Sequence, residues 1–161
     1  MNYMFRGCTS LTEIDLSNFK TDNLTEMVGM FVLCSSLKEI KLSSFKTDNV
    51  TNMSAMFLYC QSLDQLDLSS FNTIKVTDMS QMFYGCSSLI KLDLSSFKID
   101  DENDMSEMFY GCQSLKEINL SNFNTKNIND ISEIFDYISD SCTLICNDKI
   151  FVEQFNEFKN N

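Results

Sequence analysis

Residues 63–71 read LDQLDLSSF, and residues 76–86, a few positions further along, read VTDMSQMFYGC. In the first stretch, Leu66 and Leu68 alternate with polar residues, which is the period of a strand with one buried face. In the second stretch, apolar residues recur at offsets of three, six, seven and ten from Val76, which is the period of a helix with one buried face. The two stretches together predict a strand, a turn, a short helix and a second turn.

The same two stretches recur every 26 residues, as the spacing of Cys8 and Cys34 shows. No insertion interrupts them as far as Phe135. Matching residue types therefore form columns, as they do in solenoid proteins, in which neighbouring units stack and share one core. A single unit of this size cannot bury its apolar face alone, so we expect the units to fold only as an array. The most regular columns are Cys8, Cys34, Cys60, Cys86 and Cys112; Phe5, Phe31, Phe57, Phe83, Phe109 and Phe135; and Phe19, Phe45, Phe71, Phe97 and Phe123.

The columns predict an α/β repeat fold in which parallel strands form one side of the stack and short helices form the other. We expect residues 1–140 to form a solenoid of about five units, the first of them incomplete, and residues 141–161 to form a C-terminal cap. In the cap, residues 143–146 have the composition of a final strand. Asp148 is a candidate N-cap for a closing helix whose apolar face comprises Phe151, Val152, Phe155 and Phe158.

The repeat motif, LxxLxLSxF followed by NxVTxMSxMFxxC, resembles the BspA-like leucine-rich repeats of the 26-residue type. Residues 49–60, NVTNMSAMFLYC, are the best copy, and the resemblance covers about residues 4 to 135. It implies a leucine-rich-repeat solenoid with the sheet on its concave face and the helices on its convex face. It also implies a non-catalytic binding scaffold, because members of that family are mostly cell-surface proteins with a proposed role in adhesion.

Two features depart from the general leucine-rich-repeat pattern. The column of Phe19 stands where that pattern has Asn or Cys, so we expect hydroxyls of the Ser17 or Thr21 columns to bond the loop backbone instead. In the fourth unit, Ile99 replaces Thr and Glu102 replaces an apolar residue. We expect Ile99 or a shifted loop to fill that gap. Residues 100–104 would then form a solvated acidic bulge, since they lack the spaced ligands and the glycine of a calcium loop.

The composition excludes several classes of function. The chain has 23 acidic and 12 basic side chains, a net charge of −11, and it contains no His. A surface this acidic repels phosphate backbones, which argues against nucleic-acid binding. Without His, and with carboxylates on repeated columns, we expect neither an enzyme nor a cofactor. No apolar run is long enough to span a bilayer, and residues 1–5, MNYMF, do not have the basic region and apolar stretch that are typical of a signal peptide.

The candidate binding site is the outward face of the predicted sheet, because alternation places two side chains of each strand there. We expect this strip to dock a protein ligand. The alternatives are a solvated sheet face with no ligand, or a chain that acts as a structural spacer in a longer protein. The strip comprises Glu13, Asp15, Glu39, Lys41, Gln65, Asp67, Lys91, Asp93, Glu117 and Asn119.

The seven cysteines divide into two groups. The Cys column lies on the apolar face of the repeat, which favours a role as a small core residue over a disulfide or metal role. Cys142 and Cys146 in the cap are the better candidates for a disulfide, although a buried ladder with an odd total does not resemble a disulfide framework. As a zinc site this pair lacks two further ligands, so we expect no metal.

The N-terminal end begins inside a unit, and it leaves the apolar core there uncovered. Solenoids normally carry a cap at such an end. We therefore expect either a longer protein or a homodimer that covers Phe5 and Leu11. The resemblance indicates a cell-surface or secreted protein, whereas the residues themselves leave the compartment open.

Overall fold

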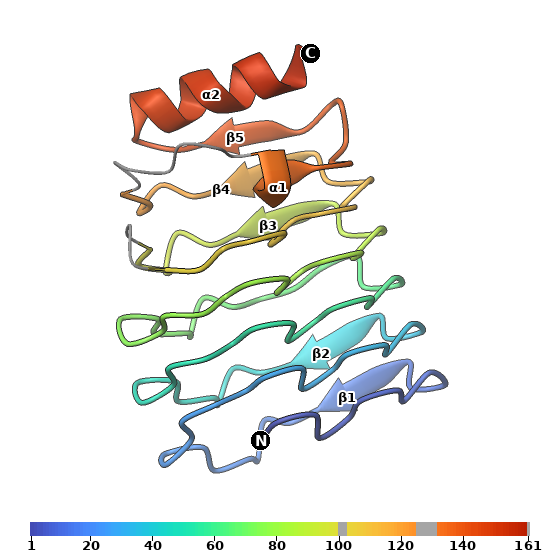
Figure 1. The fold of residues 1–161 in the computed structure, drawn as a ribbon. Helices are drawn as coiled ribbons and strands as arrows, with labels where there is room; N and C mark the ends of the chain where they lie inside the picture. The colour runs from blue at the N-terminus through green and yellow to red at the C-terminus, as the bar shows by residue number, and fades with distance from the viewer. Residues whose placement is uncertain (100–102, 125–131, 161) are drawn as a thin grey trace.

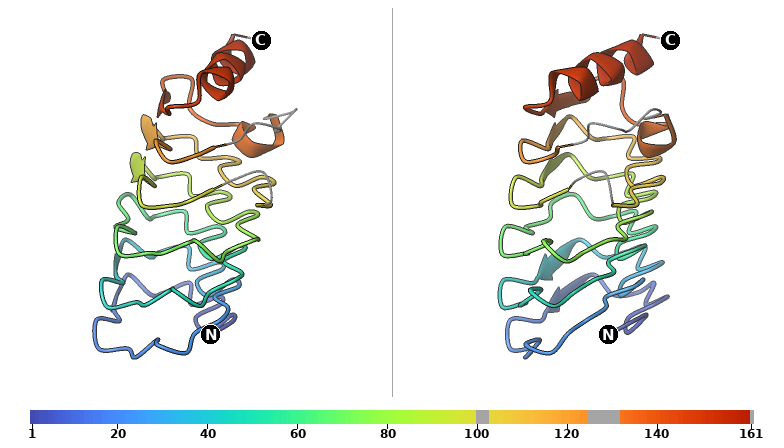
Figure 2. Two further views of the ribbon diagram at one scale, coloured as in Figure 1. Left: turned by 90° about the vertical axis from the view of Figure 1, so that its left-hand side faces the viewer. Right: turned by 60° about the vertical axis from the view of Figure 1, so that its left-hand side comes forward.

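The computed structural model describes residues 1–99, 103–124 and 132–160, and the chain winds through them as successive coils stacked along one axis (Figure 1). The strands lie on one side of the stack and runs of turns lie on the opposite side, as the views in Figure 2 show. The elements are β1 (Glu13–Asp15), β2 (Glu39–Lys41), β3 (Lys91–Asp93), β4 (Glu117–Asn119), α1 (Ser132–Phe135), β5 (Thr143–Ile145) and α2 (Lys149–Lys159).

The strands pair in parallel and in the register that the repeat predicts. Glu13 lies opposite Glu39 in the pair β1–β2, and Lys91 lies opposite Glu117 in the pair β3–β4, so each residue faces its equivalent in the next unit. Strand β5 pairs with β4, so the strands form a two-stranded sheet, β1–β2, and a three-stranded sheet, β3–β4–β5. The strand predicted in the third unit, around Leu66, is not formed, and the sheet is interrupted there.

Among the described residues, the helix predicted in the second half of each unit is formed only in the last unit, as α1. Residues 76–86, like residues 24–34, 50–60 and 103–112, are runs of tight turns instead, in which Gln81 and Gly85 have φ of 57° and 69°. The N–H groups of Gln81 and Gly85 donate to the carbonyls of Ser106 and Tyr110 in the next unit at 2.8 Å. In a helix these donors would point to carbonyls four residues earlier. Each turn therefore hydrogen-bonds to the next unit.

The spacing of the units explains why turns replace helices. Parallel strands lie about 4.8 Å apart, whereas packed helices need 8–10 Å, so a helix in every unit would spread one side of the stack. The phenylalanine rings of the turn side are 5.3 to 5.8 Å apart from Phe5 to Phe135, which matches the strand side. The apolar periodicity nevertheless identified the buried residues, since Val76, Met79 and Met82 and their neighbours Phe83 and Cys86 are all buried.

The core consists of ladders of identical residues. Phe31, Phe57 and Phe83 stack face to face within 5° of parallel. Beside them, the thiol of Cys60 donates to the carbonyl of Phe31 at 3.2 Å, and burial raises the pKa of Cys112 to about 12. The core role predicted for the Cys column is confirmed for its four members from Cys34 to Cys112, whereas Cys8 is exposed.

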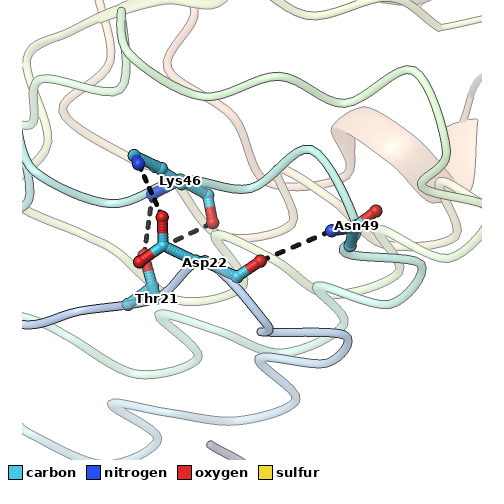
Figure 3. A network of polar contacts seen from close by, with 4 residues as sticks. All are labelled: Thr21, Asp22, Lys46 and Asn49. Carbon is cyan, nitrogen blue, oxygen red and sulfur yellow. Dashed lines mark hydrogen bonds and ion pairs between the residues drawn. The ribbon is translucent and has the colours of Figure 1, made fainter.

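A threonine ladder joins the loops that follow the strands, as predicted. The hydroxyl of Thr21 accepts the N–H of Lys46 at 2.7 Å and donates to the carbonyl of the same residue at 3.3 Å (Figure 3). The side chain of Lys46 also pairs with Asp22 at 2.5 Å, and Asn49 donates to the Asp22 carbonyl at 3.4 Å. Thr47 and Thr73 repeat the hydroxyl contacts in the next two units.

In the fourth unit, Ile99 replaces this threonine and is buried, as expected. The main chain takes over the missing contact, because the N–H of Asn124 donates to the Ile99 carbonyl at 3.0 Å. The predicted acidic bulge falls mainly on residues 100–102, which lie outside the described residues.

The closing helix α2 covers the C-terminal end of the stack (Figure 1). Asp148 caps it, as predicted, by accepting the N–H groups of Ile150 and Phe151 at 3.0 and 3.2 Å. Phe151 and Phe155 are buried against the ring of Phe135. The array is thus covered at this end by a helix with one apolar face.

The structure contradicts the pairing of Cys142 with Cys146. Both are free thiols, and strand β5 runs between them. Four residues of extended chain span roughly 13 Å, whereas a disulfide needs Cα atoms within about 7 Å. Burial raises the pKa of both thiols, to about 11 for Cys142.

Candidate functional site

The ten residues of the predicted strip lie on one face of the stack, the outward side of the sheet. Glu39 and Lys41 are exposed on either side of buried Ile40, and Lys91 and Asp93 flank buried Leu92 in the same way. We call this set of ten side chains the outward strip. Its placement follows from strand alternation, and its role as a binding surface stays a prediction.

Ion pairs connect the basic residues of the outward strip to their neighbours. Lys91 pairs with Glu117 across β3 and β4 at 2.6 Å. Lys41 lies 3.7 Å from Asp15 and 3.8 Å from Glu39. These pairs are exposed, so they add little to stability, but they hold the two lysines along the strip.

In the outward strip, the second residue of the pair that each unit contributes closes the turn after it in four of the five units. The carboxylates of Asp15, Asp67 and Asp93 accept the N–H of the serine two residues later at 2.9 to 3.0 Å, and the amide oxygen of Asn119 does the same at 3.1 Å. These hydrogen bonds to Ser lower the pKa of each of the three carboxyl groups. These residues therefore have a structural task as well as an outward position.

A groove opens on the outward strip where the sheet is interrupted. It has a volume of about 780 Å³ and lies between the second and fourth units. Half-buried Leu66 and the buried Ile40 form its apolar floor, and Ile90 stands at its edge with 44 % of its surface exposed. We call it the third-unit groove; its polar lining is Lys38, Glu39, Asp64, Gln65, Asp67, Lys91 and Asp93.

The main chain inside the third-unit groove is largely unpaired. The carbonyl of Asp64 accepts the N–H of Ile90 at 3.2 Å. In the described ranges, no main-chain hydrogen bond joins residues 65–67 to β2 or β3. The groove thus combines free main-chain donors and acceptors, an apolar floor and four carboxylates against two lysines, which is the chemistry that an extended basic peptide would match.

The sequence reasoning missed Lys38, Asp64 and Ile90, because they belong to the groove only through the break in the sheet. A signal for the break was present. Residues 64–67 read DQLD, and they include no β-branched or aromatic residue, whereas other units have Ile at position 14, 40, 90 or 118. Asp is depleted in strands and β-branched residues are enriched in them, so this segment has the weakest strand preference.

Two further kinds of site are absent from the part of the chain that the structure describes. No three His, Cys, Asp or Glu side chains there gather as metal ligands would. Nor does any described helix have the length and apolar character needed to cross a bilayer.

Comparison with known proteins identifies the family. A family profile described as "Mycoplasma protein of unknown function, DUF285" matches residues 1–118 and, in a second and overlapping match, residues 66–143. The chain belongs to this family. No curated protein matches it.

Among solved structures, the crystal structure of a leucine-rich repeat protein from T. pallidum is similar, with a TM-score of 0.52 and 19 % sequence identity. The similarity covers 90 % of this chain and 64 % of the T. pallidum chain, so the present chain spans just under two thirds of that protein's length. The shared architecture confirms the predicted leucine-rich-repeat solenoid.

Proposed function

We propose that the chain is a non-catalytic protein-interaction scaffold and that the third-unit groove is the centre of its binding surface. The observation that supports this most directly is the interruption of the sheet, which leaves the main chain of residues 65–67 unpaired beside an apolar floor. An extended peptide that lies across the outward strip would contact this apolar floor and the carboxylates beside it. The solenoid supplies a rigid frame for the contact.

We also propose the finer classification that the repeat motif suggests, namely a BspA-like 26-residue repeat protein that acts in adhesion at a cell surface. The matching motif in residues 49–60 supports this classification. The partner would be a protein with Lys or Arg side chains, because the chain carries a net charge of −11 and the groove has more carboxylates than lysines.

The groove can be tested with peptides selected from a random display library on the wild-type chain. Asp64→Lys reverses a carboxylate in the groove, and Glu153→Lys makes the same change in charge on the exposed side of α2. We expect Asp64→Lys to weaken the binding of enriched peptides about tenfold, as is usual for an interface charge made repulsive, with little change for Glu153→Lys. Equal binding by the two variants would contradict the groove as the site.

A second candidate function is a structural spacer without a ligand. The ion pairs and serine contacts of the outward strip favour it, because they give structural roles to Asp15, Asp93 and Lys91. A library from which no peptide is enriched, on a chain shown to be folded, would favour the spacer over the scaffold.

A further inference from the structure

Four tyrosines form a continuous row on the turn side of the stack, away from the strands. Tyr84 and Tyr110 are stacked, with ring centroids 4.5 Å apart and planes within 8° of parallel. Tyr59 meets Tyr84 at 5.3 Å, nearly edge-on, and Tyr137 meets Tyr110 at 5.1 Å. We call these four residues the tyrosine stripe.

The tyrosine stripe is accessible to a partner. Tyr59 and Tyr137 expose 37 % and 67 % of their surface, while Tyr84 and Tyr110 are half-buried. Leu33, in the same column as Tyr59, extends the apolar row with 41 % of its surface exposed. Aromatic side chains that are fixed against each other lose little freedom on binding, and Tyr is among the residues that dominate binding energy at interfaces.

Most of the charges around the stripe are negative. The turn segments 24–36, 50–62, 76–88, 103–114 and 132–141 contain seven acidic residues and no Lys or Arg. Lys159 reaches back from α2, but its ammonium group donates to the carbonyls of Ser139, Asp140 and Cys142. Arg6, in the first turn segment, lies over the ring of Tyr3, 5.6 Å from its centroid. The turn side thus combines aromatic rings with an excess of carboxylates.

We propose that the tyrosine stripe is a second docking surface, which binds an arginine-containing segment of a partner protein. Aromatic faces attract cations, and the planar guanidinium group also stacks on a ring, which an ammonium group does not do. The surrounding carboxylates add long-range attraction for the same segment. This surface is separate from the third-unit groove, and the proposal does not depend on the groove.

Two peptides of equal charge, hexa-arginine and hexa-lysine, test the proposal on the full chain. The chain contains no Trp, and four of its five tyrosines lie in the stripe, the fifth being Tyr3, so tyrosine fluorescence reports mainly on the stripe. We expect hexa-arginine to bind several-fold more tightly than hexa-lysine and to change the tyrosine emission. Equal affinities of the two peptides would mean that net charge alone attracts them, and this would overturn the proposal.

The double variant Y84L/Y110L removes two rings without a change in charge, and Y84F/Y110F keeps the rings as a matched control. We expect Y84L/Y110L to bind hexa-arginine about tenfold more weakly, and Y84F/Y110F to remain within twofold of the wild type. Because the two rings are half-buried, folding is checked by thermal unfolding, and Y137L, at the most exposed ring, serves as a second variant. Unchanged hexa-arginine binding by folded Y84L/Y110L, or by Y137L if the double variant does not fold, would overturn the proposal.

Discussion

At the scale of single residues, Asp67 shows how an outward carboxylate supports the fold. It accepts the N–H of Ser69 at 3.0 Å, and this contact lowers its pKa. Asn119 makes the equivalent contact with Ser121 through a neutral amide, so a neutral oxygen also closes the turn, although the lowered pKa of Asp67 means that its charged form accepts the N–H more strongly. We therefore expect Asp67→Ala to lower the free energy of unfolding by about 1 kcal/mol, and Asp67→Asn to lower it by much less, as measured by urea denaturation at neutral pH.

The same residue predicts a dependence on pH. A carboxyl group whose pKa is lower in the folded state stabilises the fold above its unfolded pKa of about 3.9, and that stabilisation disappears as the pH falls through the folded pKa. The wild type should therefore lose stability below about pH 4 more steeply than Asp67→Asn. Parallel curves for the two proteins would show that the charge of Asp67 plays no part.

At the scale of elements, the turn segments depend on residues with positive φ. Gly85 and Gly111 have φ of 69° and 71°, and a side chain at either position is strained by about 1 kcal/mol or more. A Cβ atom on Gly85 would lie 2.6 Å from the ring of Tyr59, whereas one on Gly111 would have no neighbour closer than 3.7 Å. We expect Gly85→Ala to destabilise the chain more than Gly111→Ala and to change the tyrosine fluorescence. Similar losses would show that Tyr59 moves aside freely.

The turn segments also show what could not be predicted from the sequence. The positions of Val76, Met79 and Met82 fit one face of a helix, and these residues are indeed buried. A run of turns that places every third or fourth residue inward has the same burial pattern, so periodicity identified the buried face but not the backbone. The decisive factor was the distance between units, which a single unit does not encode. The strand residues, by contrast, were predictable in the units that have a β-branched residue there. The break at residues 64–67 was harder to predict, because it depends on the low strand preference of four successive residues and not on one residue.

At the scale of the whole molecule, the secondary structure itself is testable. The helices of the described residues are α1, with four residues, and α2, with eleven. Far-ultraviolet circular dichroism should therefore show a weak helical signal. A spectrum dominated by helix would mean that the turn side is helical after all, as the periodicity alone predicted. An Asp148→Ala variant, which removes the N-cap of α2, provides a control for the contribution of that helix.

The outward strip and the tyrosine stripe both run across several units, and both were only partly visible in the sequence. Alternation located the strip, because two side chains per strand must face outward. The stripe combines two adjacent columns, with Tyr59 and Tyr137 in one and Tyr84 and Tyr110 in the other, so no single column revealed it. Only the contacts between rings of successive units bring the four together.

The hydrogen bonds of the turn side keep one constant offset from unit to unit, and this regularity has a consequence for inheritance. Phe31, Phe57 and Phe83 each donate through the main chain to the next unit in the same way, so every inner unit presents the same partners to both neighbours. A gene duplication or deletion that spans a whole number of repeats would leave those partners unchanged. Such a lineage can lengthen or shorten its protein in a single genetic event and vary the reach of its surfaces while it keeps one architecture.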